Sequence, residues 1–299
     1  MSTTIAFLGL GHMGLPMAVN LVKAGFAVTG FDPVPAAVAA AGEAGIPVAP
    51  TASEAVAGAE VVITMFPSGK HVIDAYQGVD GLLAAAKPGT LFIDSSTIAV
   101  DDARTAHELA VAAGHVNVDA PVSGGVGGAT AGTPAFMVGG SAEDFARAEP
   151  ILTPMAGRIV HCGDPGAGQA AKVCNNLILG ISMIAVSEAF VLGEKLGLTH
   201  QALFDVASNA SGQCWALTTN CPVPGPVPAS PANNDYRPGF SGALMAKDLG
   251  LAEQAIESTG VHSEIGTLAS AIYHRFAEQG GAGLDFSAII NEIRDRSAA

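Results

Sequence analysis

Basic side chains are scarce in this sequence. Its 299 residues include 13 Lys and Arg against 27 Asp and Glu, which gives a formal net charge of −14 at pH 7. Charged residues make up only 13%, about half of the usual fraction of roughly 25%. Binding to nucleic acids depends on clustered Lys and Arg that neutralise phosphates, and no such run is present. We therefore expect no nucleic-acid partner.

Cysteine is also rare, and its spacing indicates neither disulfides nor a metal site. The four cysteines (Cys162, Cys174, Cys214 and Cys221) form no C-x-x-C pair, and the eight histidines show no metal-ligand spacing such as H-x-x-E-H. A disulfide scaffold is not expected at this length, so a reducing compartment is the default. The N-terminus has no basic segment followed by a long apolar run, as a signal peptide would. We expect a cytoplasmic protein without a metal.

Apolar residues are abundant, at 49% of the chain, with a mean hydropathy of +0.41. The segment 177–193 is almost apolar enough to suggest a membrane span, which needs about 20 such residues. Asn175 and Asn176 precede it, however, and Glu188 interrupts it. We therefore predict a buried helix of a soluble protein and no membrane partner.

The first half of the chain alternates short apolar runs with helical patterns. Continuous apolar strands separated by helices are typical of a parallel sheet covered on both faces, and right-handed crossovers then give a doubly wound α/β fold. The predicted strands are 4–8, 27–31, 60–66, 90–93, 115–119, 134–139 and 158–161, and the predicted helices among them are 13–24, 34–43, 99–113 and 142–153.

The second half shows only helical patterns after Gly168. The predicted helices are 168–196, 199–210, 242–258, 262–278 and 286–296. The segment 222–239 holds six of the 18 prolines and is predicted to be an extended loop rather than a helix. We predict an α/β domain over 1–164 and an all-helical domain over 165–299, with the turn at 163–166 as the hinge.

A glycine motif of the form G-x-G-x-x-G follows the first strand and opens the first helix, namely Gly9-Leu10-Gly11-His12-Met13-Gly14. In a dinucleotide-binding turn, Gly9 permits the tight turn, Gly11 lets the backbone approach a pyrophosphate, and Gly14 allows close packing of helix and strand. The free N–H groups at the helix N-terminus favour phosphate. The motif in this context predicts a dinucleotide site.

Asp32 supports that prediction, because it ends the second strand 18 residues after Gly14. A carboxylate there accepts hydrogen bonds from ribose hydroxyls and repels a 2′-phosphate. The residues that follow, 33–35, include no Arg. The sequence therefore predicts NAD rather than NADP as the cofactor; the alternative is a structural glycine turn with a solvent-exposed Asp.

A second glycine cluster, at 119–128, reads Asp-Ala-Pro-Val-Ser-Gly-Gly-Val-Gly-Gly. Successive glycines after a strand can turn several N–H groups toward an anion, and Ser123 adds a hydroxyl donor. A carboxylate or phosphate would suit such a site. A flexible glycine-rich loop explains the same residues, so the pattern leaves both interpretations open.

Three polar residues mark the start of the long apolar helix. Lys172, Asn175 and Asn176 stand at positions i, i+3 and i+4 and therefore share one face. A lysine held in a partly desolvated site can act as a general acid or base, and an asparagine can orient it or the substrate. The alternative is a helix start that faces solvent, with Lys172 as an ordinary surface charge.

Four motifs in order resemble those of the β-hydroxyacid dehydrogenases, and among them the members that act on 3-hydroxyisobutyrate. The resemblance extends over about residues 5–295. It rests on Gly-Leu-Gly-His-Met-Gly at 9–14, Asp-Ala-Pro-Val-Ser-Gly-Gly at 119–125, Gly-x-Gly-x-x-x-Lys-x-x-Asn-Asn at 166–176 and Met-Ala-Lys-Asp-Leu at 245–249. It implies an NAD-binding Rossmann domain, a long interdomain helix, a helical substrate and oligomerisation domain, and a cleft between the domains.

The resemblance also implies residue roles. Lys172 would be the catalytic lysine, taking the proton of the substrate hydroxyl in oxidation and returning it in reduction. The residues implied to bind substrate are Ser123, Gly124, Gly125, Asn176 and Phe240, with Asn175 in support. Asp248 is implied to support Lys247. Besides the glycine turn and Asp32, the residues implied to contact the cofactor are Met65, Phe66, Pro67, Thr97 and Lys247, the last of these reaching cofactor or substrate.

Departures from other family members narrow the expected substrate. Relatives that act on 6-phosphogluconate have the motif Lys-x-x-His-Asn, and this chain has Asn175 at the position of its His. Imine-reducing relatives replace the catalytic lysine, which is present here as Lys172. We expect oxidation of 3-hydroxyisobutyrate to methylmalonate semialdehyde, as in valine breakdown. One methyl group is worth only ~1–3 kcal/mol of discrimination, so 3-hydroxypropionate, L-serine and glycerate remain alternatives. A homodimer or homotetramer is implied, and a non-catalytic dinucleotide sensor is a remote alternative.

Overall fold

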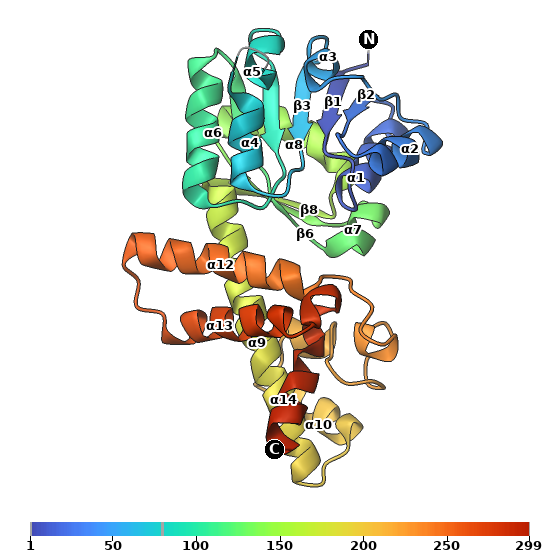
Figure 1. The fold of residues 1–299 in the computed structure, drawn as a ribbon, viewed down its shortest axis with the longest axis vertical. Coiled ribbons are helices and arrows are strands. Elements are labelled where there is room, and N and C mark those ends of the chain that lie inside the picture. The colour runs from blue at the N-terminus through green and yellow to red at the C-terminus, as the bar shows by residue number, and fades with distance from the viewer. Residues whose placement is uncertain (1, 79–80, 299) are drawn as a thin grey trace. The chain divides into compact units, whose positions relative to one another are not determined.

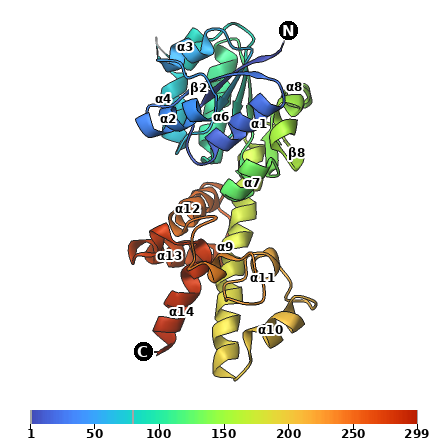
Figure 2. The ribbon, with the colours of Figure 1, turned by 90° about the vertical axis from the view of Figure 1, so that its right-hand side faces the viewer.

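The computed structural model describes residues 2–78 and 81–298. The chain divides into two compact units, Met1–Lys172 and Val173–Ala299. One continuous helix, α9 (Ala167–Lys195), begins in the first unit and continues through the second. The division into domains at 164/165 stays a prediction. Figures 1 and 2 show the two units.

The first unit is built on an eight-stranded sheet with the order β2-β1-β3-β4-β5-β7-β6, in which β8 also pairs with β7. The first five strands in that order are parallel, whereas β7 runs antiparallel to β5 and β6. The strands are β1 (Thr4–Leu8), β2 (Ala27–Phe31), β3 (Val61–Thr64), β4 (Leu91–Asp94), β5 (Val116–Asp119), β6 (Val122–Ser123), β7 (Ala135–Gly139) and β8 (Arg158–Gly163). The predicted Rossmann-type doubly wound fold is confirmed.

Successive side chains of a strand point to opposite sides of the sheet, so an apolar strand makes both faces apolar. Helices cover both of these faces. In β3, Val61 and Ile63 join one buried core, and Val62 between them joins the other. The first core is completed by α1 (Gly14–Lys23), α2 (Pro35–Glu43) and α8 (Ala142–Leu152). The second is completed by α3 (Ala52–Val56), α4 (Gly69–Tyr76), α5 (Leu82–Ala85) and α6 (Val100–Ala112).

The second unit is helical, as predicted. Its core is formed by buried side chains of α9, α12 and α13, among them Met183, Met245 and Tyr273. A Cβ at Gly180 would lie 3.0 Å from Leu249, so α9 and α12 approach closely there. Figure 1 shows α12 and α13 side by side. Beyond α9 the helices are α10 (His200–Ala207), α11 (Trp215–Thr218), α12 (Gly242–Thr259), α13 (Glu264–Glu278) and α14 (Ile289–Ala298).

Helix α9 explains the apolar segment noted in the sequence. Within the described part of the chain it is the one helix long and apolar enough to cross a membrane by length and composition. Core helices of soluble proteins pass the same test, and Met183 and Phe190 of α9 are fully buried in the second unit. Ile178 and Leu192 are exposed on the same helix. Packing inside the unit therefore accounts for part of its apolar surface.

The proline-rich segment 222–239 is a loop of bends and turns with one 3-10 helix (Pro231–Asn233). It contains no α-helix, as predicted, but its turns depart from the predicted extended conformation. Its end is held by the buried carboxylate of Asp285, whose Oδ2 accepts hydrogen bonds from the N–H groups of Gly239 (3.0 Å) and Phe240 (3.2 Å). Its beginning is held by Tyr236, whose hydroxyl donates to the carbonyl of Pro222 (2.8 Å).

Candidate active site

The glycine turn between β1 and α1 has the geometry that a dinucleotide needs. Gly9 has φ +94°, and a Cβ there would lie 2.3 Å from the carbonyl oxygen of Met65. A Cβ at Gly14 would lie 1.8 Å from the carbonyl oxygen of Gly9. A Cβ at Gly11, in contrast, would meet no atom within 4 Å. Gly9 and Gly14 are thus required by the fold, and Gly11 leaves open space beside the N-terminus of α1 that suits a pyrophosphate.

Asp32 sits beside this turn and helps to hold it. Its Oδ2 accepts a hydrogen bond from the N–H of Leu10 (2.7 Å), and its Oδ1 accepts one from the N–H of Val34 (2.8 Å). The carboxylate is half-buried, and each oxygen retains a further lone pair for a ribose hydroxyl. The residues around the glycine turn therefore fit a dinucleotide. The contact to Leu10 adds a structural role that the sequence did not indicate.

The turns after β3 and β4 are joined by a buried polar network. The N–H of Phe66 donates to Ser96 Oγ (2.8 Å), and Ser96 Oγ donates to Asp94 Oδ1 (2.6 Å). Thr64 Oγ1 donates to the same carboxylate oxygen (2.7 Å). This network fixes the cofactor-contact residues predicted at 65–67 against the loop that carries Thr97. Sequence reasoning missed Asp94 and Ser96, although both lie beside the predicted Thr97.

Asp94 is a buried acid at the carboxyl end of β4. Its Oδ2 has no hydrogen-bond partner within the described part of the chain. Burial raises the pKa of Asp94 from 3.8 to about 6 against the opposing effect of its bonds to Ser96 and Thr64, and the nearby charge of Asp119 raises it further. Burial likewise raises the pKa of Asp119, while N–H groups at the start of α9 lower it.

The second glycine cluster forms the start of a short helix rather than a flexible loop. Ser123 ends β6, and Gly124 (φ +150°) and Gly125 (φ +62°) lead into α7 (Gly125–Ala131). A Cβ at Gly124 would also approach Pro134 Cα to 3.0 Å. The positive φ angles turn the chain in a way that few residues besides glycine adopt. The binding of a carboxylate here stays a prediction.

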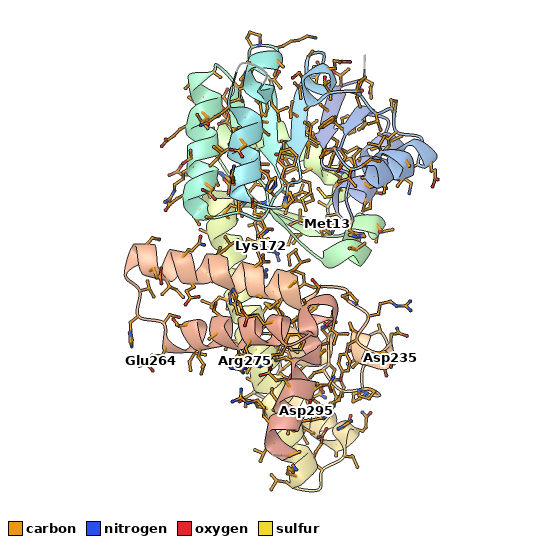
Figure 3. The ribbon with its side chains drawn as sticks, in the orientation of Figure 1. Met13, Lys172, Asp235, Glu264, Arg275 and Asp295 are labelled. Carbon is orange, nitrogen blue, oxygen red and sulfur yellow. The ribbon has the colours of Figure 1, made fainter. Side chains whose placement is uncertain are left out.

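Lys172 and Asn176 lie one turn apart on the same face of α9, and both are buried, with 5% and 1% of their surface exposed. Figure 3 labels Lys172 on this helix. Burial contradicts the alternative that Lys172 is an ordinary surface charge. Asn176 Nδ2 donates to Asp248 Oδ2, and Asn176 Oδ1 accepts from Asn175 Nδ2 (2.9 Å). Asp248, which was predicted to support Lys247, thus orients Asn176.

The other predicted residues of the second unit lie on α12 and just before it. Lys247 is half-buried on α12, next to Asp248. Phe240 is half-buried, and its ring packs edge-on against Phe286 with the ring centres 5.7 Å apart. In the described part of the chain, no three His, Cys, Asp or Glu side chains are grouped so as to hold a metal ion.

Comparison with known proteins identifies the chain's family. Residues 4–163 match the NAD-binding domain of 6-phosphogluconate dehydrogenase, and residues 166–293 match a domain described as NAD-binding in NADP-dependent 3-hydroxyisobutyrate dehydrogenase. A solved structure of Mycobacterium tuberculosis 3-hydroxyisobutyrate dehydrogenase with L-serine superimposes with a TM-score of 0.94 at 60% identity, over 98% of this chain and 100% of that one.

Two relatives in Pseudomonas aeruginosa carry different names. A 3-hydroxyisobutyrate dehydrogenase is 50% identical over 96% of this chain and 97% of its own length. An NAD-dependent L-serine dehydrogenase is 47% identical over 95% of this chain and 96% of its own length.

Together with the fold and the glycine turn, these matches define the class, an NAD-dependent oxidoreductase with a Rossmann-type NAD-binding domain. Within that class the chain belongs to the 3-hydroxyisobutyrate dehydrogenase family, a member of the β-hydroxyacid dehydrogenases that the motifs predicted.

Two glycine substitutions separate cofactor binding from folding. Gly11→Ala places a methyl group in open space, so we expect an unchanged melting temperature but at least about tenfold weaker NAD binding, since the backbone can no longer approach the pyrophosphate. Gly14→Ala drives a methyl group into Gly9 and should lower the melting temperature by several degrees. Thermal unfolding and NAD titration measure both effects. Equal NAD affinity in Gly11→Ala and the wild type would contradict this assignment.

Asp94 makes stability depend on pH in a defined direction. Because its folded pKa of about 6 exceeds its ordinary value, the folded state binds more protons than the unfolded state between about pH 4 and 6, and stability falls as pH rises through that window. The full cost above the window is roughly 3 kcal/mol. Asp94→Asn keeps an oxygen acceptor without the charge, so its gain in stability over wild type should be larger at pH 7.5 than at pH 4.

Urea unfolding across this pH range measures the difference. The exposed Asp205 of α10 provides the control, because a substitution at the surface such as Asp205→Asn should change stability little. If the gain in unfolding free energy for Asp94→Asn did not vary with pH, it would show that folding does not raise the pKa of this carboxyl group.

Proposed function

We propose that this enzyme oxidises 3-hydroxyisobutyrate to methylmalonate semialdehyde with NAD, the step that valine breakdown requires. The observation that carries the proposal is the burial of Lys172 on the first turns of α9, one turn from the buried Asn176. A buried lysine costs free energy unless it is compensated, so its presence on an otherwise apolar helix calls for a role. Membership in the 3-hydroxyisobutyrate dehydrogenase family supports proton transfer as that role.

In this mechanism Lys172 in its neutral form accepts the proton of the substrate hydroxyl as the carbonyl forms. NAD, when bound, would accept the hydride from the carbon that bears this hydroxyl. In the reverse direction the protonated Lys172 donates to the carbonyl oxygen. Proton transfer by a positioned side chain contributes about 10²–10⁴-fold to a rate.

The proposed substrate contacts follow from the chemistry of the groups. The N–H groups of Gly124 and Gly125 and the hydroxyl of Ser123 suit a carboxylate, because each can donate to an anion. Asn176 is held by Asn175 and Asp248 and retains an N–H donor for the substrate. Phe240 supplies an apolar wall, and Lys247 supplies a positive charge.

The proposed cofactor contacts lie along the carboxyl edge of the parallel strands, where ligands of this fold bind. Residues 9–14 receive the pyrophosphate, Asp32 receives a ribose and disfavours the 2′-phosphate of NADP, and residues 65–67 and Thr97 contact the nicotinamide half. The domain over 1–164 binds NAD, and that over 165–299 serves substrate binding and assembly into a homodimer or homotetramer. We place the enzyme in the cytoplasm.

L-serine is the second candidate substrate. It shares with 3-hydroxyisobutyrate a carboxylate and a primary hydroxyl on the third carbon, and differs by an amino group in place of a methyl. The 47% identity to an L-serine dehydrogenase is close to the 50% identity to a 3-hydroxyisobutyrate dehydrogenase, and the mycobacterial structure is described with L-serine. Overall identity therefore does not separate the two substrates.

A substrate panel tests the proposed reaction. We expect the highest kcat/KM for 3-hydroxyisobutyrate, at about 10–200-fold above 3-hydroxypropionate, because one methyl group in an apolar pocket supplies about that much. L-serine and glycerate complete the panel, and each acid is measured with NAD and with NADP. A best substrate without the 2-methyl group would overturn the assignment. Equal use of NADP would overturn the role of Asp32.

Lys172→Ala tests the mechanism. We expect turnover to fall by two orders of magnitude or more, with the dissociation constant of NAD unchanged, because the variant lacks the proton-transfer group but keeps the glycine turn. Lys195→Ala provides the matched control, since Lys195 is exposed at the end of the same helix. Unchanged turnover in Lys172→Ala would remove this residue from the mechanism.

A further inference from the structure

The side chain of Gln169 connects the start of α9 to the loop after β4. Gln169 has no exposed surface. Its Nε2 donates to the carbonyl oxygen of Ser96 (2.7 Å), and its Oε1 accepts from the N–H of Ile98 (3.2 Å). These two main-chain groups flank Thr97. Because one end of the amide donates and the other accepts, a carboxylate or an apolar side chain of the same size cannot make both bonds.

The main chain of the same helical turn is held from the sheet. Asp119, at the end of β5, accepts hydrogen bonds from the N–H of Gly166 at Oδ1 (2.7 Å) and from the N–H of Gln169 at Oδ2 (2.8 Å). These are N–H groups that a helix start leaves without partners in the helix itself. A carboxylate from a distant strand thus caps α9.

Glycines let this turn touch the strands directly. A Cβ at Gly168 would lie 2.3 Å from the carbonyl oxygen of Met137, and one at Gly139 would lie 2.8 Å from the N–H nitrogens of Ala167 and Gly168. The first turn of α9 is therefore fixed by backbone contact, by the Asp119 cap and by the Gln169 amide. All of these contacts lie within the first unit.

We propose that Gln169 is a positioning residue for the reaction, which sets Lys172 relative to the loop that carries Thr97. Lys172 follows Gln169 by three residues on the same helix, so a shift of this turn moves the lysine with it. A displacement of about 1 Å in a reacting group can cost about 10²-fold in rate. The proposal rests on the proposed function, because it assigns proton transfer to Lys172 and the nicotinamide side to Thr97.

Gln169→Met tests the proposal, because it keeps the volume and removes both hydrogen bonds. We expect kcat for the best acid of the panel to fall about 10- to 100-fold, with KM and the dissociation constant of NAD within about threefold of wild type. Thr90→Val is the stability control. It removes a buried hydroxyl that donates to the carbonyl of Lys87 (2.7 Å). Thr90 directly precedes β4, at the amino end of the strand, so the change should lower the melting temperature but leave kcat unchanged.

A double-mutant cycle shows whether Gln169 acts through Lys172. In the Lys172→Ala background, Gln169→Met should cost little further turnover, because the group that it positions is gone. Equal costs in both backgrounds, or a fall in melting temperature with an unchanged kcat, would overturn the proposal. If Gln169→Met does not fold, Gln169→Glu carries the same test, since it keeps the acceptor for Ile98 and loses the donor to Ser96.

Failure of the proposed function gives a different result. Wild-type turnover in Lys172→Ala would contradict the lysine mechanism itself, whatever Gln169→Met shows. A slow Lys172→Ala together with a wild-type kcat in Gln169→Met would contradict the positioning role alone.

Discussion

The hydrogen bonds from the first turn of α9 to the carboxylate of Asp119 are the contact on which the candidate site depends. They join the last position of a central strand to the helix that carries Lys172 and Asn176. Without them, N–H groups buried at the helix start would lose their partners, at a cost of about 1–3 kcal/mol each. The same carboxylate therefore stabilises the fold and fixes the start of α9, the helix that carries the proposed general base Lys172.

Three acidic residues, Asp32, Asp94 and Asp119, stand at the carboxyl edge of the sheet in a protein that already carries a net charge of −14. Each accepts main-chain hydrogen bonds from a neighbouring turn, so their charge is directed at N–H groups of the protein. Global charge acts at long range, whereas an anionic ligand responds to the groups nearest to it. Glycine N–H groups and a few lysines can therefore serve anions in an acidic protein.

The sequence allowed prediction of the features that rest on local pattern. The long strands and helices, the turn at Gly9–Gly14 and the face shared by Lys172 and Asn176 all follow from periodicity and spacing. Short elements such as α3 and α5 were missed because four or five residues show no clear period, and α7 was missed because its glycines favour a loop. Gln169 and Asp119 were missed because their partners lie 71–73 and 47–50 residues away in the chain.

Gly139 and Gly168 lie where β7 and the first turn of α9 are in such close contact that each position has room only for glycine. Each faces the backbone of the other's segment, where an added carbon would fall inside van der Waals contact with main-chain atoms. Main-chain atoms cannot move aside as a flexible side chain can. Replacing either glycine by a larger residue therefore creates a clash, and replacing both creates two clashes instead of relieving the first. During divergence of related sequences this pair of positions should stay closed to every other amino acid, even where the substrate changes.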